Sequence, residues 1–240
     1  MRLDRNGVAA VTGNATVASK DFEDFIYLIS HDVRNSVRAL IEVPQWIAED
    51  LVDAGHRIEG PLGENIRLLN THTSRLDRML HDLLIYSRIG RMQAVVEMDL
   101  AAALETLLGE LRLPPGFRLS LDLAAPALRI GESDLMTLLT ALVTNSIRHR
   151  DSDIGEIRIS SRRDAGEVVL TYRDDSPGIP LALREQAFRA MTTLKSRDEV
   201  EGSGMGLAHV AKIVATYRAG LQWLDMESSR GIGFEFRFAE

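Results

Sequence analysis

The stretch DFEDFIYLISHDVRNSVRALIEVPQWIAEDLVD, residues 21–53, carries apolar side chains in alternating steps of three and four residues. They are Phe22, Ile26, Ile29, Val33, Leu40, Val43 and Ile47, with one gap at Ser36. This spacing predicts a long helix with a single apolar seam, of the kind that packs in coiled coils. Pro44 falls inside the predicted helix and is expected to bend it.

A second run with the same spacing follows a turn-rich break, DAGHRIEGPLGE, at residues 53–64. It extends from about residue 62 to about residue 89, with seam positions at Leu62, Ile66, Leu69, Thr73, Leu76, Leu80 and Leu83. Two helices joined by a short break predict an antiparallel hairpin. Because a lone hairpin buries too little of such a seam, two chains are expected to pair into a dimeric four-helix bundle.

One histidine on the first helix has unusual neighbours. If the seam residues around it occupy heptad positions a and d, His31 falls at position f and faces solvent, with Asp32 beside it and Asn35 one turn further on. An exposed imidazole with a carboxylate and a carboxamide nearby suits an activated nucleophile. The alternative is a polar patch that solvates the helix surface. His81 repeats the dipeptide with Asp82 but is followed by apolar residues, so we interpret it as structural.

Composition narrows the class of protein. The 240 residues are 45% hydrophobic and 26% charged, which is typical of one or two packed domains. A net charge of -7 without a long Lys/Arg run disfavours binding to nucleic acid. The absence of cysteine excludes disulfides, thiol nucleophiles and cysteine zinc sites. No segment approaches the roughly 18 apolar residues of a membrane span. We interpret residues 1–19 as a flexible leader and expect a cytoplasmic protein.

The patterning changes after about residue 93. Helices are predicted near residues 99–112, 132–150, 181–188 and 205–218. Strands are predicted at residues 117–123, 156–163, 167–175, 221–229 and 234–239, the last two forming a hairpin around RGIG. Strands and helices mixed without strict βαβ alternation predict an α+β sandwich, with one sheet covered on one face by helices. The expected domains are therefore a helical hairpin over residues 20–93 and an α+β domain over residues 94–240.

Three short motifs in this second half carry chemistry. TNSIRH, residues 144–149, ends an apolar helix and offers the Asn145 oxygen to a hard cation such as Mg²⁺, with Arg148 available to phosphate. DDSPGIP, residues 174–180, follows a strand and offers the Asp174 carboxylate to an amine. GSGMGL, residues 202–207, opens a helix whose amides suit phosphate. Singly, these motifs also fit a polar helix end, a turn and a hinge.

Together and in this order, the motifs resemble the catalytic half of a two-component sensor histidine kinase. That family combines a dimerisation and histidine-phosphotransfer domain with an ATPase domain of the gyrase, heat-shock chaperone, kinase and mismatch-repair superfamily, the Bergerat fold. SHDVRNSV matches its H box, TNSIRH its N box, DDSPGI its G1 box, Phe188 an F-type residue and GSGMGL its G2 box. DLLIYSRIG, residues 82–90, resembles the usual end of the second hairpin helix.

The resemblance implies roles for individual residues. His31 would attack the γ-phosphate of ATP with Asp32 as general base, and Asn35 would hold a water for the reverse, phosphatase reaction. Asn145 would ligate Mg²⁺, and Asp174 would recognise adenine. The remaining nucleotide-binding residues would be Arg148, His149, Gly178, Ile179, Phe188, Gly202, Gly204, Met205, Gly206 and Leu207. Residues 191–203 would form a lid over the nucleotide.

The resemblance also implies partners: a second copy of the chain, the receiver domain of a response regulator, and a separate sensor protein. Three positions depart from the family pattern, namely Ser36 in place of proline, Ala141 in place of an N-box asparagine and Ser176 in place of the first G1 glycine. The last two are expected to weaken ATP binding. Two alternatives therefore stay open: a phosphotransfer adaptor with a degenerate ATP site, and a partner-switching serine kinase.

Overall fold

The computed structural model describes residues 33–34, 36–194, 202–226 and 230–240. The chain divides into two compact units, residues 1–87 and 88–240. The predicted leader and the predicted catalytic residues His31, Asp32 and Asn35 lie outside the described residues. The domain boundary expected near residue 93 stays a prediction, although residues 88–93 are grouped with the second unit.

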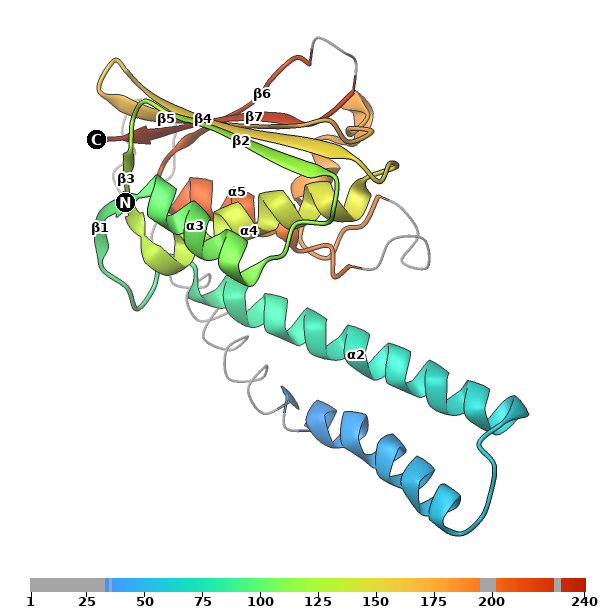
Figure 1. Cartoon of the computed structure of the whole chain (residues 1–240). Helices are drawn as coiled ribbons and strands as arrows, with labels where there is room; N and C mark the ends of the chain where they lie inside the picture. The colour runs from blue at the N-terminus through green and yellow to red at the C-terminus, as the bar shows by residue number, and fades with distance from the viewer. Residues whose placement is uncertain (1–32, 35, 195–201, 227–229) are drawn as a thin grey trace, which may run out of the picture. The chain divides into compact units, whose positions relative to one another are not determined.

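The first unit contains the two predicted helices (Figure 1). A helical segment over residues 36–53 ends in a turn, where the His56 amide donates to the Leu51 carbonyl oxygen at 2.9 Å. Helix α2 then runs from Gly60 to Arg88. Pro61 lies in its first turn, where a missing backbone donor breaks no helical hydrogen bond. The break and the second helix are confirmed, and the first helix is confirmed over residues 36–53, whereas residues 21–32 of that prediction lie outside the described residues.

The apolar faces of this hairpin differ from the single predicted seam. Buried positions include Val37 and Pro44, seven residues apart, and Thr73, Leu80 and Leu84 on α2. Predicted seam residues that are instead exposed are Leu40, Val43 and Ile47, and Leu62, Leu69 and Leu76 on α2. Each helix therefore has a buried stripe and an exposed apolar stripe. The exposed stripe is the part of the predicted seam that a second copy of the chain is expected to cover, and that pairing stays a prediction.

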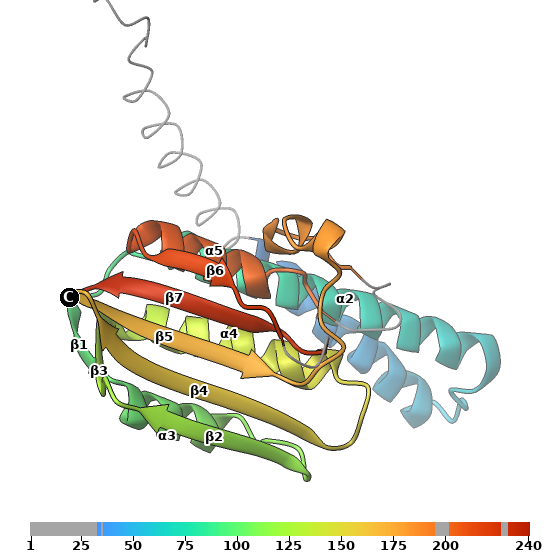
Figure 2. The same cartoon turned by 90° about the horizontal axis from the view of Figure 1, so that it is seen from above.

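The second unit is built on a five-stranded sheet with the order β2-β4-β5-β7-β6 (Figure 2). Its strands are β2 (Phe117–Leu123), β4 (Gly155–Asp164), β5 (Glu167–Asp174), β6 (Gly220–Trp223) and β7 (Gly233–Ala239). β2 pairs with β4 in parallel and the other neighbours are antiparallel. A separate two-stranded sheet joins β1 (Val95–Asp99) to β3 (Ala127–Gly131), which the sequence analysis missed.

Three helices cover one face of the large sheet: α3 (Leu100–Glu110), α4 (Glu132–His149) and α5 (Gly206–Thr216) (Figure 1). Alternate residues of the strands point toward them, as the period of a half-buried strand requires. The buried residues of this layer include Ile157, Ile159, Leu170, Tyr172, Phe234 and Phe236 from the sheet and Leu135, Leu138 and Leu142 from α4. The predicted α+β sandwich is confirmed.

Two predicted elements are shorter than expected. Residues 181–188 form two separate 3₁₀ turns, η1 (Leu181–Leu183) and η2 (Gln186–Phe188), instead of one helix. The segment is too short to stabilise an α-helix against the cost of its first turn. Strand β6 covers four residues and ends at Trp223, whereas the alternation in the sequence predicts a strand up to residue 229.

Candidate functional site

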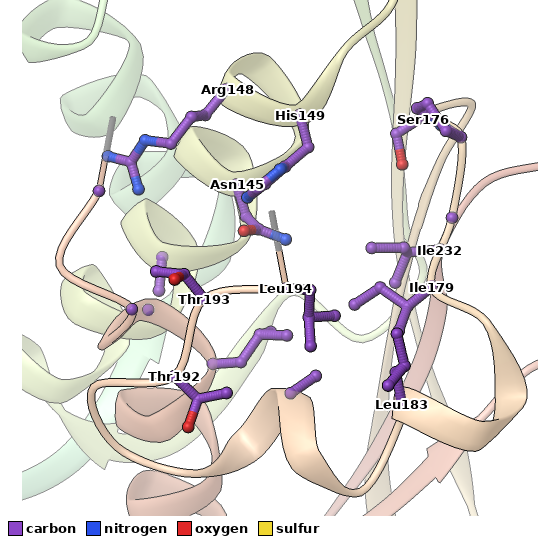
Figure 3. Close-up of a pocket in the computed structure, with 18 of the residues that line it drawn as sticks. Asn145, Arg148, His149, Ser176, Ile179, Leu183, Thr192, Thr193, Leu194 and Ile232 are labelled. Atoms are coloured by element: carbon purple, nitrogen blue, oxygen red, sulfur yellow. The ribbon is translucent and has the colours of Figure 1, made fainter. Parts of the chain in front are cut away.

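A cavity of about 280 Å³ opens between the end of α4, the turn after β5 and the glycine loop before α5 (Figure 3). Its lining residues are Ala141, Thr144, Asn145, Arg148, His149, Ser176, Pro177, Gly178, Ile179, Pro180, Leu183, Ala187, Thr192, Thr193, Leu194, Gly202, Gly204, Gly206, Leu207 and Ile232. The three motifs of the second half thus meet at one cavity, although up to about sixty residues separate them in the chain.

One wall of the cavity is polar and comes from the last turn of α4. Asn145, Arg148 and His149 share a helical face because they are three and four residues apart, and Figure 3 shows them extending from the same side of the helix. An added Cβ at Gly202 would lie 3.2 Å from Arg148 Nη1, so the guanidinium lies directly against the glycine loop. This wall places one fixed positive charge and one carboxamide at the cavity.

The opposite wall is apolar. Figure 3 shows Ile179, Leu183 and Ile232 facing the cavity from the turn after β5, from η1 and from the position just before β7. Ser176 lies at one end of this wall. An apolar surface of this kind suits the flat face of an aromatic ring system, and a small number of polar groups at its edge would set the orientation of the ring.

Asp174 lies behind the apolar wall and is not among the residues that line the cavity. It is only 5% exposed. Its Oδ1 accepts hydrogen bonds from the Ser176 amide at 3.1 Å, the Ser176 hydroxyl at 2.8 Å and the Ile232 amide at 2.8 Å. Its Oδ2 accepts one from the hydroxyl of Ser146. Since Ser176 and Ile232 line the cavity, the carboxylate is one residue layer away from it.

The hydrogen-bond network of Asp174 continues into the core through Ser146. Ser146 Oγ lies 2.7 Å from Tyr172 Oη, and Tyr172 Oη also lies 3.1 Å from the carbonyl oxygen of Leu142, to which it can donate. Burial, together with the negative charge of Asp174, raises the pKa of Tyr172 well above its ordinary value. Tyr172 therefore stays protonated at neutral pH, and the network keeps its donor.

The glycine loop closes the cavity at the start of α5. Gly204 has a φ of +75°, and an added Cβ there would lie 2.6 Å from the Thr192 carbonyl oxygen. Only glycine combines that backbone conformation with so close an approach. The loop leads directly into the first turn of α5, where backbone amides without helical partners suit an anion.

The cavity brings together nine of the predicted nucleotide-binding residues: Asn145, Arg148, His149, Gly178, Ile179, Gly202, Gly204, Gly206 and Leu207. Three others do not line it. Asp174 lies behind the wall, and Met205 is fully buried at the start of α5. Phe188 packs against Trp223 and Phe234, with ring centroids 5.6 and 5.9 Å apart.

Sequence reasoning missed part of the lining. Leu183, Ala187 and Ile232 were not singled out as site residues, because an apolar residue in a turn carries no local signal of a ligand. Of the predicted lid, residues 192–194 and 202 line the cavity, and residues 195–201 lie outside the described part of the chain.

The polar side chains at the cavity suit a cation that arrives bound to a triphosphate. They suit a cation held by protein side chains alone less well. Within the described residues no group of three or more His, Asp or Glu side chains gathers to hold a metal ion. Magnesium keeps waters and phosphate oxygens as ligands and needs only one or two protein oxygens. The Asn145 carboxamide at the polar wall could supply one such oxygen.

Comparison with known proteins agrees with this geometry. Residues 131–240 match the family described as histidine kinase-, DNA gyrase B- and HSP90-like ATPase. Cyanobacterial phytochrome A from a Nostoc species is 27% identical over 226 residues, which are 91% of this chain and 28% of that protein. The methanogenesis regulatory histidine kinase FilI from Methanothrix harundinacea is 29% identical over 226 residues, 91% of this chain and 25% of that protein.

A solved structure shows the same fold over most of the chain. Full-length ShkA in complex with AMPPNP aligns with a TM-score of 0.65 at 16% identity, covering 90% of this chain and 45% of that one. The fold and the cavity thus define an ATPase domain of the histidine kinase, gyrase and HSP90 type. Together with the helical hairpin, this domain makes the chain similar to the catalytic core of histidine kinases.

The chain spans about a quarter of the length of these two curated relatives. In the portion of the chain that the structure describes, no helix is both long and apolar enough to cross a membrane.

Proposed function

We propose that the chain is an ATP-dependent protein-histidine kinase that phosphorylates its own His31 and passes the phosphoryl group to an aspartate of a response regulator receiver domain. The observation that supports this most directly is the two-sided cavity. Its polar wall carries Arg148, Asn145 and the glycine loop, and its apolar wall is backed by the Asp174 carboxylate. The polar wall suits the phosphates of an adenine nucleotide, and the apolar wall suits its ring.

The residues divide between the ends of the nucleotide. The adenine ring would pack against Ile179, Leu183 and Ile232, with its exocyclic amine directed to Asp174. The phosphates would meet Arg148 and the amides of the glycine loop, and Asn145 would contribute an oxygen to Mg²⁺. Bound Mg-ATP would supply the transferable γ-phosphoryl group.

The transfer itself would be a displacement at phosphorus. An imidazole nitrogen of His31 forms the new P–N bond, the bond from the γ-phosphorus to the bridging oxygen breaks, ADP leaves, and Asp32 accepts the imidazole proton. Such transfer depends mainly on positioning and on neutralising phosphate charge. In a second step a receiver-domain carboxylate takes the phosphoryl group from the histidine. Asn35 would support the hydrolysis of that acyl phosphate, giving the protein a phosphatase activity.

We also propose that the active form is a homodimer that pairs through the hairpin. Leu62, Leu69 and Leu76 recur every seven residues on α2 and are all at least 39% exposed. A stripe of this length gains free energy when it is buried against a second copy. The cytoplasmic location and the separate sensor protein that we expected from the sequence stay predictions.

The cavity bears on the main alternative, an adaptor that keeps His31 but has lost ATP binding. A degenerate site would have no reason to keep the left-handed Gly204 or the hydrogen bonds that hold Asp174 behind the wall. Ser176, which we expected to weaken ATP binding, donates its hydroxyl to Asp174. A kinase is therefore a better interpretation of the site than an adaptor.

Incubation with γ-labelled ATP and Mg²⁺ tests the proposal. We expect acid-labile label on the wild-type chain and none on His31→Ala. His81→Ala is the matched control, since it removes the same His-Asp dipeptide from α2, and it should keep the label. An adaptor would stay unlabelled with ATP but accept phosphate from a phosphorylated partner. A serine kinase would place acid-stable label on an added protein only.

A further inference from the structure

An ion pair between Arg230 and Asp151 lies close to the cavity but outside its lining. The Arg230 guanidinium donates to both carboxylate oxygens of Asp151, with Nη2 2.7 Å from Oδ1 and Nη1 3.1 Å from Oδ2. Two parallel bonds of this kind give an arginine–carboxylate pair a defined geometry as well as energy. Nη2 also lies 3.4 Å from the Asp175 carbonyl oxygen, to which it can donate. One side chain thus contacts two other segments of the domain.

Each member of the pair lies two residues from a residue that lines the cavity. Asp151 follows the end of α4, where His149 belongs to the polar wall. Arg230 precedes Ile232 of the apolar wall, and Figure 3 shows His149 and Ile232 on these two walls. The pair therefore links the polar wall to the apolar wall across 79 residues of sequence.

A second link holds the same walls together deeper in the domain. It is the buried hydrogen bond from Ser146 of α4 to Asp174 at the end of β5. The outer link is fixed to the turn after β5, because Gly231, the neighbour of Arg230, donates its amide to the Ser176 carbonyl oxygen at 2.6 Å. Without the outer link, the end of α4 is held to this turn at its base alone.

We propose that Arg230 and Asp151 are positioning residues that set the distance between the two walls and hold the cavity at the width that a nucleotide spans. This inference rests on the proposed function and deepens it. Neither residue belongs to the three motifs, and neither lines the cavity. A ligand that needs both walls binds more weakly in proportion to the fraction of molecules that lose the required spacing.

The pair should respond to salt. The side chains of Arg230 and Asp151 are 51% and 45% exposed, so dissolved ions screen their attraction. The hydrogen bonds to Asp151 raise the pKa of Arg230 above its ordinary value, so the arginine stays charged near neutral pH. Salt concentration is therefore the variable that weakens the link in the unmodified protein.

Calorimetric titration of the full chain with Mg-ATP and with adenosine tests the inference. Arg230→Gln should weaken the binding of Mg-ATP about threefold at low salt. The difference from the wild type should vanish at about 1 M salt, where the pair is screened in both proteins. Adenosine would contact the apolar wall alone, so it should bind the variant and the wild type equally.

Asp151→Asn separates positioning from simple charge. This change removes a negative charge near the proposed phosphate site, so electrostatics alone would strengthen the binding of Mg-ATP. Loss of the link should instead weaken it about threefold. The double variant, Asp151→Asn with Arg230→Gln, should also bind about threefold more weakly than the wild type, because all three variants lack the same ion pair.

Arg158→Gln is the matched control. Arg158 also donates to both carboxylate oxygens of its partner, Glu156, at 3.0 Å, but both residues lie on β4 and the pair bridges no wall of the cavity. This variant loses the same charge as Arg230→Gln and should bind Mg-ATP like the wild type.

Three results would overturn the inference while leaving the kinase proposal in place. They are tighter binding of Mg-ATP by Asp151→Asn, losses that multiply in the double variant, and an equal loss of adenosine binding. A wild type that binds no Mg-ATP at all would overturn the proposed function itself, and this inference with it.

Discussion

The Tyr217 hydroxyl donates a hydrogen bond of 2.8 Å to Asp134 Oδ2 and accepts one of 3.0 Å from the Gly131 amide. Asp134 is buried in the first turn of α4, and Tyr217 follows the end of α5. The same Oδ2 accepts the Gly90 amide at 2.9 Å. One carboxylate oxygen thus joins the segment that follows α2 to two helices of the ATPase domain.

Tyr217→Phe should lower the stability of the ATPase domain by about 1–2 kcal/mol at neutral pH, because it removes two hydrogen bonds at a partly buried site. The unfolding of this domain can be followed by Trp223 fluorescence in a Trp46→Phe background during urea titration. An unchanged midpoint would show that the Asp134–Tyr217 bond contributes nothing measurable.

The same variant should flatten the alkaline pH dependence of stability. Burial, followed by the hydrogen bond to Asp134, raises the pKa of Tyr217 to about 12, whereas an unfolded tyrosine ionises near about 10. The stability that protonated Tyr217 confers is therefore complete below about pH 10 and is lost as the pH rises through about 12. The free energy of unfolding, measured by urea titration, should therefore fall less between pH 9 and about pH 11.5 in Tyr217→Phe than in the wild type. The pKa of Tyr172 is also raised, but this residue adds the same pH dependence to both proteins and so does not affect the comparison.

Gly90→Ala should destabilise the ATPase domain by about 2 kcal/mol. Gly90 has a φ of +78°, and an added Cβ would lie 2.4 Å from Thr216 Cγ2. Gly109→Ala is the matched control, because Gly109 lies in α3 with open space around it and should gain a few tenths to about 1 kcal/mol. Thr216→Ala should partly rescue the first variant by removing the clash. Equal midpoints for the two glycine variants would contradict the prediction.

Asn145→Ala should weaken ATP binding about tenfold in the presence of Mg²⁺, a cost of about 1.4 kcal/mol, and should have little effect in excess chelator. The reason is that Asn145 is proposed to contribute an oxygen to the cation. Thr137→Ala, on the same helix, removes a hydroxyl that donates to the Ser133 carbonyl oxygen at 2.7 Å and should bind like the wild type. An equal loss with and without Mg²⁺ would assign Asn145 to the nucleotide instead of the metal.

Leu69→Glu should convert the proposed dimer to a monomer in sedimentation experiments, because it would bury a charge in the paired hairpins. Leu68→Glu is the control, since Leu68 is also exposed on α2 but lies about 100° further around the helix. Dimers that survive both changes, or dissociate with both, would argue against pairing through the Leu62, Leu69 and Leu76 stripe.

Local patterns predict most of the secondary structure of this chain. The helix predicted near residues 132–150 is observed as Glu132–His149, and the strand predicted at residues 117–123 is observed at those residues. Both elements show a clear period over many residues. By contrast, β1 and β3 were missed, because each is five residues long and its partner is about thirty residues away in the chain.

Helix period, strand alternation and turn residues act over a few neighbouring positions, so they were enough to predict the two helices of the hairpin, the α+β class of the second unit and the three motifs. The tertiary structure decided which apolar stripe of each helix is buried. It also decided that Ile232, Ser146 and Ser176 converge on Asp174. Ile232 and Ser146 lie 58 and 28 residues from Asp174, and no local rule links residues so far apart. Only the packing of α4 and β7 against the end of β5 brings them together.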